Sequence, residues 1–454
     1  MLISPTFSYQ QTLLYILLWI FNIKNIEGDY NGYTLYNIVP TTNEQLKFLR
    51  KVERQGSLWA IFWKKSQKLY ESAQILVNIE DKESFLEKVY DYGFDVEELI
   101  RDVQKEFDKQ SVNNFMRHQN ESYTWERYHN WDEINKWITD LPKKFPNITE
   151  VKKIGQTVEG RDILALSIKK ENASKGIVIE GGIHGNEWVA IEFCTYLINS
   201  LLEPNTENDK TLGVIAAKIS WYIIPILNPD GFYYTHKTDR LWNKNRNNYV
   251  SGTGVDLNRN FDSNFCKFDS SAIPYHDNFC GPSPNSELET KALATFVESR
   301  HNLTGYISIR SYGQKIILPF GDRKRHLGNY FVMENYAKQA VVRMYEHSKN
   351  KHKYAFGTNF DVSGIRVSGE SASWVKKNFK VPYVFTFYLG DNGTFGHALP
   401  PDLIQPTCKE SLLGLTELLT AKPKYLREDI YLENRTAVGH YFSTILFIVL
   451  SFLL

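Results

Sequence analysis

The segment His184-Gly185-Asn186-Glu187 contains two side chains of the kinds that bind zinc in proteins. Imidazole nitrogen and carboxylate oxygen are both zinc ligands, and a spacing of three residues places them on one face of a helix. The apolar run 176–180 predicts a strand, so the pair should lie where a strand ends and a helix begins. The spacing alone is a weak signal. Eleven histidines allow a chance match, and Glu187 could simply favour the positive end of a helix dipole.

Further motifs along the chain strengthen the metal-site interpretation. They are Asn228-Pro229-Asp230-Gly231-Phe232, Arg240-Leu241-Trp242, residues 255–261 (VDLNRNF) and Phe385-Thr386-Phe387. In order and spacing, across about residues 122–425, they resemble the zinc metallocarboxypeptidase family of the pancreatic carboxypeptidase A/B type. The resemblance implies an α/β fold with a mixed, largely parallel sheet and helices on both faces. It also implies an extracellular zinc enzyme that removes the C-terminal residue of a peptide.

The resemblance is incomplete at the metal. His184 and Glu187 match the family's first two zinc ligands, and Asp256 matches the aspartate that supports the first histidine. The third ligand, a histidine in the family, is Arg310, and a guanidinium has no lone pair to donate. Since a catalytic zinc needs three protein ligands, we expect no zinc here and predict that Arg310 pairs with Glu187.

Other catalytic positions also differ from the family pattern. Tyr388 stands at the position of the general-base glutamate, and a phenol is a poor base at neutral pH. Asn243 and Asn186 replace two arginines, of which the first stabilises the oxyanion in the family, and Ile365 falls near the mobile capping tyrosine. The sequence therefore predicts an inactive homologue. Two alternatives stay open: an active carboxypeptidase with a rebuilt zinc site, and a structural or interaction protein with a filled cleft.

One part of the family's substrate site is unchanged. Asn258 and Arg259 match the pair that holds the terminal carboxylate of the substrate, where a planar arginine binds both oxygens. Peptide or protein C-termini are therefore possible partners, although Arg259 could instead be held by internal hydrogen bonds. Tyr312 and His397 should line the same cleft. Ala372, at the floor of the side-chain pocket, does not support a preference for basic terminal residues.

Residues 29–117 are predicted to form a separate domain before the carboxypeptidase-like domain of residues 122–425. Their pattern is strand, helix, strand, strand, helix, strand (33–39, 43–55, 58–63, 73–79, 82–92 and 96–100). This order predicts a small α+β, ferredoxin-like domain, and it resembles the family's inhibitory activation domain. A polar linker with Lys109 and Arg117 should connect the two domains and expose sites for trypsin. An inactive protein has no activity that an activation domain must inhibit, so we expect this domain often to stay attached.

The two ends of the chain predict export. Residues 1–28 contain an eleven-residue apolar run at 13–23, the length of a signal-peptide core, and the tail 426–454 ends in fourteen uncharged residues. That tail favours a removable glycolipid-anchor signal, with a short membrane anchor or a buried helix as alternatives. The expected location is extracellular, secreted or attached to the outer cell surface. Six Asn-x-Ser/Thr sequons agree with it, at Asn120, Asn147, Asn172, Asn302, Asn392 and Asn434.

Composition argues against nucleic acid as a partner, and four cysteines allow at most two disulfides. With 53 basic and 52 acidic residues the net charge is +1, so nucleic acid is not an expected partner. Cys266 and Cys280 flank a short loop and should form a disulfide in an exported chain. Cys194 and Cys408 are the candidate second pair.

Overall fold

The computed structural model describes residues 28–55, 60–111, 123–169, 173–204, 212–214, 217–326, 328–347 and 351–420. The predicted signal peptide, except for Gly28, and the predicted C-terminal tail lie outside these residues. So do Arg117 and the sequons at Asn120, Asn172 and Asn434. Among the described residues, no helix combines the length and the apolar character needed to cross a bilayer.

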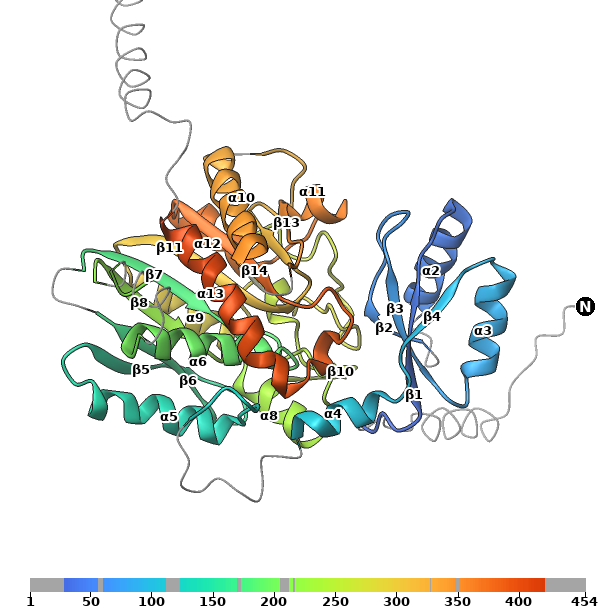
Figure 1. The fold of residues 1–454 in the computed structure, drawn as a ribbon, viewed down its shortest axis with the longest axis horizontal. Coiled ribbons are helices and arrows are strands. Elements are labelled where there is room, and N and C mark those ends of the chain that lie inside the picture. Colours follow the sequence, from blue (N-terminus) through green and yellow to red (C-terminus); the bar gives the residue numbers. More distant parts are fainter. Residues whose placement is uncertain are drawn as a thin grey trace, which may run out of the picture.

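The N-terminal domain has the predicted βαββαβ order (blue in Figure 1). Its elements are β1 (Tyr33–Ile38), α2 (Asn43–Gln55), β2 (Ile61–Lys64), β3 (Ala73–Asn78), α3 (Lys82–Asp91) and β4 (Val96–Ile100). The strands form an antiparallel sheet in the order β2-β3-β1-β4. Apolar residues of both helices, among them Leu49, Val52, Phe85 and Val89, pack on this sheet and form its core.

The segment after β4 differs from the expected linker. Residues Val103–Ser111 form helix α4, and Lys109 lies inside it, paired with Glu106 at 2.7 Å. Val103 and Phe107 are buried in a cluster that also contains Ala398 of the larger domain. The apolar spacing of these two residues, four apart, is the signal that sequence reasoning missed.

The larger domain is built on an eight-stranded mixed sheet (Figure 1). The strand order is β13-β12-β14-β11-β7-β8-β6-β5, and the central strands β14, β11, β7 and β8 run parallel. The strands are β5 (Thr149–Gln156), β6 (Asp162–Ile168), β7 (Lys175–Glu180), β8 (Ile219–Ile224), β11 (Leu303–Tyr312), β12 (Lys315–Ile317), β13 (Ala355–Gly357) and β14 (Tyr383–Leu389). A short hairpin, β9 (Asn248–Tyr249) with β10 (Gly252–Thr253), lies outside this sheet.

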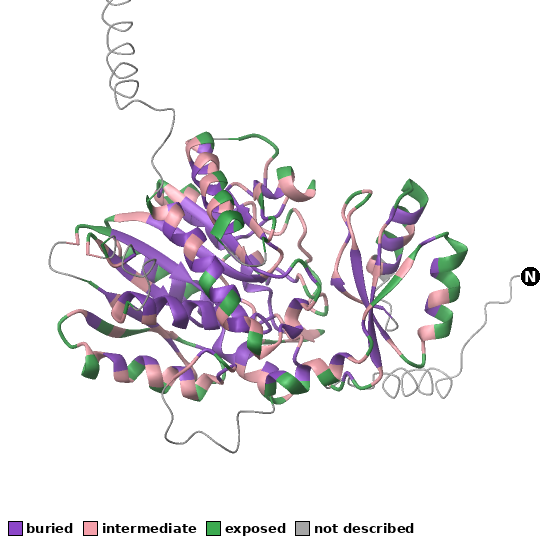
Figure 2. Cartoon of the chain, in the orientation of Figure 1, coloured by how far each residue is buried: buried purple, intermediate pink, exposed green. Residues whose placement is uncertain are grey.

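Helices cover both faces of the sheet, as predicted. On one face α5 (Trp131–Lys144), α6 (Trp188–Leu202), α10 (Tyr330–His347) and α13 (Ile404–Thr420) contribute to the larger apolar core. On the other face α9 (Leu288–Glu298) and α12 (Ser371–Phe379) contribute to a second core. The smaller helices are α8 (Pro229–Lys237), α11 (Asn359–Ser363), η1 (Leu257–Arg259), η2 (Gly396–Ala398) and η3 (Pro401–Leu403). Figure 2 shows the central strands buried between these layers, which explains their continuous apolar sequences.

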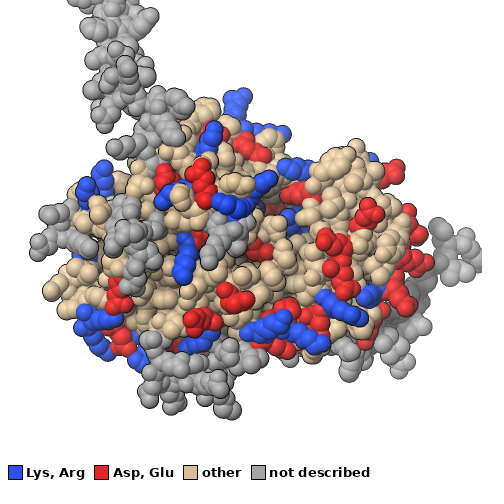
Figure 3. Space-filling view, in the orientation of Figure 1, with Lys and Arg blue, Asp and Glu red and all other residues tan. Residues whose placement is uncertain are grey.

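Charge on the molecular surface is mixed. Figure 3 shows basic and acidic side chains interspersed over the visible face, in keeping with the net charge of +1. Any basic site on this protein is therefore a local feature and not part of a general positive field.

Candidate functional site

His184 and Glu187 lie in the turn between β7 and α6, and not on a helix face as the spacing predicted. Helix α6 begins at Trp188, with Glu187 as its N-cap residue. Glycines fix this turn: Gly182 has φ of +57°, and a side chain at Gly185 would collide with the backbone of Gly231. The predicted proximity is still correct, because the turn brings His184 Nδ1 to 3.5 Å from Glu187 Oε1.

Arg310, near the end of β11, forms the predicted ion pair with Glu187. Its Nε donates to Glu187 Oε1 at 3.0 Å and Oε2 at 2.9 Å, and its Nη2 lies 2.9 Å from Oε1. The side chains are only 4% and 6% exposed. Although burial opposes ionisation of Glu187, the Arg310 guanidinium beside it lowers its pKa to about 2. The carboxylate is therefore ionised and neutralised from within the protein.

The same guanidinium also binds His184. Arg310 Nη2 lies 2.6 Å from His184 Nδ1, and His184 Nε2 lies 2.8 Å from Asp256 Oδ1. Since a guanidinium can only donate, Nδ1 accepts and Nε2 carries the proton that is donated to Asp256. Arg310 thus engages the lone pair of His184 and both carboxylate oxygens of Glu187. These are the atoms with which the two residues would bind a metal ion.

This donor set does not fit the zinc ion that the family implies. A catalytic zinc requires three protein ligands around an open position, whereas here two ligands face a permanent cation. In the part of the chain that the structure describes, no three His, Cys, Asp or Glu side chains converge so as to hold a metal ion.

Tyr388, at the general-base position, lies between two cations. The strand order β12-β14-β11 and the register place Lys315 and Arg310 on either side of it. The Lys315 amine is 4.5 Å and the Arg310 guanidinium 5.5 Å from the centroid of its ring. Burial raises the pKa of the phenol, so Tyr388 stays protonated at neutral pH. Sequence reasoning missed Lys315, because only the strand register shows that it faces Tyr388.

The two asparagines that replace arginines have local structural partners. Asn186 Nδ2 donates to the carbonyl of Leu241 at 2.8 Å, and Asn243 Nδ2 donates to that of Asp277 at 3.2 Å. Ile365 follows α11 and is partly exposed, and it has no polar group with which to cap a substrate.

Asn258 and Arg259 lie on η1, where Asp256 caps the turn by accepting from Asn258 N at 2.9 Å. Asn258 Oδ1 accepts from the backbone of Ser371 at 3.1 Å. Arg259 donates from Nε to the carbonyl and from Nη2 to the carboxylate of Asp269, both at 2.7 Å, and from Nη1 to Asn258 O at 3.2 Å. The pair thus has internal partners, and Arg259 Nη1 also lies 4.0 Å from the carboxylate of Asp256.

Glu370, two residues before Ala372, is a second residue that sequence reasoning missed. Its carboxylate is buried and accepts from Asn359 Nδ2 at 2.8 Å and from Ser373 Oγ at 3.2 Å. Gly321 makes room for it, since a side chain there would collide with Glu370 Oε2. The expectation drawn from Ala372 considered one position only. A buried carboxylate, that of Glu370, precedes Ala372 by two residues. The glutamate at 370 was the available signal.

The N-terminal domain contacts the residues expected to line the cleft. Trp63 on β2 stacks on His397, with ring centroids 6.0 Å apart, and its carbonyl accepts from the Tyr312 hydroxyl at 2.9 Å. At the α4 end, Arg240 Nε donates to Gln110 Oε1 at 2.8 Å, and Gln110 Nε2 donates to the carbonyls of His397 and Leu399. The two domains thus share buried polar contacts as well as an apolar cluster.

The cysteines follow one prediction and contradict the other. Cys266 and Cys280 form a disulfide, with Cα atoms 5.7 Å apart. The second predicted pair is wrong: Cys194 on α6 and Cys408 on α13 are both free and buried. Packing explains them without a bond, because both side chains belong to the apolar core between these helices and the sheet.

Two other histidines, His236 and His301, lie outside the candidate site. His236 stacks on Trp188 with ring centroids 3.9 Å apart, and burial lowers its pKa to about 3. His301 is exposed in the turn between α9 and β11.

Comparison with known proteins agrees with the fold and the motifs. The sequence matches the zinc carboxypeptidase family over residues 134–414 and the carboxypeptidase activation peptide over residues 36–110. The chain therefore belongs to the zinc carboxypeptidase family.

Similar proteins match over about two thirds or more of the chain. Carboxypeptidase O of Bos taurus is 34% identical over 309 residues, covering 66% of this chain and 80% of the relative. Carboxypeptidase A6 of Homo sapiens is 30% identical over 400 residues, covering 86% and 90%. A crystal structure of thrombin activatable fibrinolysis inhibitor (TAFI) superposes with a TM-score of 0.79 at 27% identity, covering 87% of this chain and 99% of that one.

Proposed function

We propose that this chain is an exported carboxypeptidase homologue that neither binds zinc nor hydrolyses peptides. The observation that carries the proposal is the position of Arg310, whose guanidinium bonds to both candidate metal ligands, His184 and Glu187. A zinc ion would have to displace a buried cation that neutralises a buried carboxylate, and no third donor would replace it. Even with metal, the site would lack a carboxylate base, because Tyr388 stands in its place.

Export to the outside of the cell, with attachment at the surface, is part of this proposal. Its supports are the disulfide Cys266–Cys280, which is typical of oxidising compartments, and the apolar segments at both ends of the sequence. The membrane would be a partner only through the C-terminal tail.

The deciding experiment measures zinc and hydrolysis on the same preparation. Purified full chain is dialysed against zinc, analysed by mass spectrometry under native conditions, and incubated with peptides ending in apolar, basic or acidic residues. We expect no stoichiometric zinc and no release of C-terminal residues. One tightly held zinc per chain, or turnover that a chelator abolishes, would establish the alternative of an active enzyme with a rebuilt site.

A second candidate function is binding of peptide C-termini without hydrolysis. It is favoured by the match of Asn258 and Arg259 to the carboxylate-binding pair, and by the guanidinium of Arg259, whose hydrogen bonds to Asp269 and Asn258 do not use every N–H. A charge-assisted bidentate contact contributes about 1.5–3 kcal/mol, enough for weak recognition of a free carboxylate. We propose affinities between micromolar and millimolar for peptides with free C-termini, and none for amidated peptides.

Calorimetric titration of both peptide forms into the wild type and into R259A tests this second candidate. Because Trp63 contacts Tyr312 and His397, the titration is repeated after cleavage between the two domains and separation of the fragments. Free peptide that binds the wild type and not R259A would support the proposal. Equal affinity for the two peptide forms, or no binding by either preparation, would leave the alternative of a structural or interaction protein with a filled cleft.

A further inference from the structure

A pocket lies at the other end of the central strands of the large sheet, away from the candidate site around Arg310. The parallel strands β7, β8 and β11 begin there, whereas His184, Glu187 and Arg310 lie at or beyond the ends of β7 and β11. The pocket has a volume of about 170 Å³. Gly176 keeps its floor open, since a side chain there would press against Tyr222 and Leu303.

The residues that line this pocket are basic or neutral. Lys169, Lys175 and Arg300 carry three positive charges, His301 adds an imidazole, and neither Asp nor Glu is among the lining residues that the structure describes. Within the described residues, none of these three cations has an ion-pair partner. On a protein with a net charge of +1 and mixed surface charge, such an uncompensated group of cations is a local feature.

Arg300 is held in place by contacts that leave its terminal nitrogens available. Its guanidinium lies 5.0 Å from the centroid of the Tyr222 ring and 4.7 Å from that of Phe296, and its Nε donates to Ser299 Oγ at 3.2 Å. Ring contacts and one hydrogen bond from Nε orient the guanidinium without using Nη1 or Nη2. A planar fork held in this way suits two oxygens of one anion.

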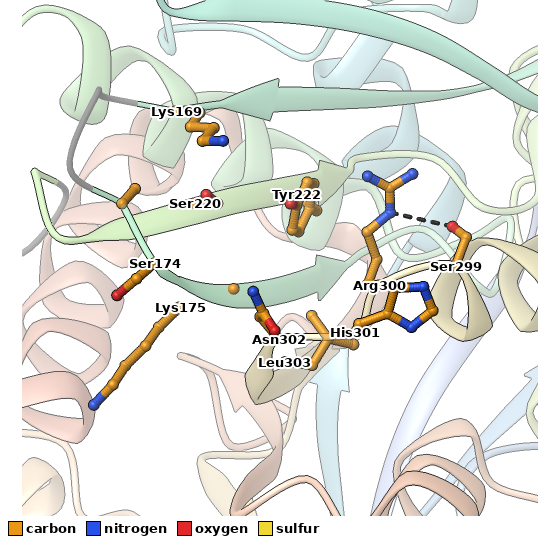
Figure 4. A pocket seen from close by; sticks show the side chains of 12 residues that line it. Lys169, Ser174, Lys175, Ser220, Tyr222, Ser299, Arg300, His301, Asn302 and Leu303 are labelled. Atoms are coloured by element: carbon orange, nitrogen blue, oxygen red, sulfur yellow. Dashed lines mark hydrogen bonds between the residues drawn. The ribbon is translucent and has the colours of Figure 1, made fainter.

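Figure 4 shows how the other groups lie around Arg300. Arg300 rises past Tyr222 towards β8, and Lys169 lies on the far side of the buried Ser220. Lys175 stands at the opposite rim with its amine turned outward, so it adds charge to the entrance and not a direct contact. Because the Tyr222 ring stands between Arg300 and Lys169 in this view, Arg300 is the expected direct ligand, and Lys169 adds positive charge beside the Ser220 hydroxyl.

We propose that this pocket binds a tetrahedral oxyanion, a phosphate or sulfate group, either free or as an ester on a larger molecule. Its charge, its hydroxyl groups and its size match such a group. A carboxylate, with only two oxygens, would use fewer of the donors. This site is independent of the proposed function, because it shares no residue with the site around Arg310.

The experiment titrates full chain with four probes: inorganic phosphate, inorganic sulfate, glucose 6-phosphate and glucose 6-sulfate. Binding is measured by calorimetry and by the shift of the unfolding midpoint, with sodium chloride at matched ionic strength as the reference. Since Asn302 lies at the pocket and in a sequon, all proteins carry T304A, which removes the sequon and leaves the Asn302 side chain unmodified. Free ions binding as well as the esters would identify the ion as the ligand. Esters binding at least tenfold tighter would identify a phosphorylated or sulfated molecule.

Two variants test the residues. R300Q combined with K169Q should weaken binding at least tenfold, whereas K291Q removes one charge from an exposed position of α9 outside the pocket and should not. Each variant is compared with its own unfolding midpoint in the absence of anion, because R300Q also removes the contacts of Arg300 with Tyr222 and Phe296. Binding that R300Q/K169Q leaves unchanged, or a midpoint shift that chloride reproduces at the same ionic strength, would overturn the proposal.

Discussion

Replacing Arg310 by methionine should expose the cost of burying Glu187 without a counter-charge. The pKa of Glu187 is about 2, against an ordinary value of 4.5, and this difference corresponds to about 3 kcal/mol of stabilisation of the ionised form. Removing one partner of a buried ion pair generally costs about 3–5 kcal/mol. His184 Nδ1, 3.5 Å from Glu187 Oε1, offers a partial replacement. We therefore expect R310M to lower the free energy of unfolding by about 3 kcal/mol.

Urea denaturation followed by tryptophan fluorescence measures this loss, and a double-mutant cycle assigns it to the pair. E187Q/R310M removes both charges and should be about 2 kcal/mol more stable than R310M, since no uncompensated charge remains. K291M replaces an exposed cation and serves as the control. A loss below about 1 kcal/mol for R310M, or losses that simply add in the double variant, would refute the reasoning.

The pH dependence of the stability difference between wild type and R310M supplies an independent check, because the direction of its change is defined. Because the folded pKa of Glu187 is depressed, its contribution is complete above the ordinary value of 4.5 and is lost as the pH falls towards 2. The difference in stability between wild type and R310M should narrow over that window. A difference that stays constant from pH 5 to pH 2.5 would show that Glu187 is not the group involved.

Three further outcomes follow from the contacts described. Replacing both Cys266 and Cys280 by serine should lower the free energy of unfolding by about 3 kcal/mol, the value for a loop of this length. Thiol titration of the native wild type should detect neither Cys194 nor Cys408 until the protein unfolds. Rapid labelling of these thiols in the native state would contradict their burial. Trypsin should cleave the bond after Arg117 earlier than the bond after Lys109, because Lys109 lies within α4. Mass spectrometry of the early fragments gives the order, and earlier cleavage after Lys109 would contradict this prediction. After cleavage the two domains should still co-elute in gel filtration. The variant Q110L, which leaves the Arg240 Nε without its acceptor, should make the cleaved domains dissociate faster than those of the wild type. Equal dissociation rates would mean that this contact does not hold the domains together.

Much of the fold was readable from local patterns in the sequence. Apolar runs predicted the central strands because strands buried on both faces carry continuous apolar sequence, and the βαββαβ order was legible from alternating segments. Helix α4 was missed, since its buried residues pack on the other domain, and no local pattern states that a second domain is near. The Cys194–Cys408 pair failed for a related reason: the sequence gives cysteine positions but not the direction in which each side chain packs.

At the candidate site, the sequence by itself determined which chemical groups are present. Arginine at position 310 has no lone pair to offer a metal ion, and tyrosine at position 388 has no carboxylate, whatever the conformation of the chain. Only the tertiary structure decided what these residues do instead: Arg310 meets His184 and Glu187 at distances set by the turn before α6, and Lys315 reaches Tyr388 through the strand register. The same is true of the basic pocket, where Lys169 after β6 and Arg300 before β11, far apart in sequence, line one pocket because the sheet order β11-β7-β8-β6 brings these strand ends to the same side. Residue types fix the available donors and acceptors, whereas the packing of distant segments fixes their partners.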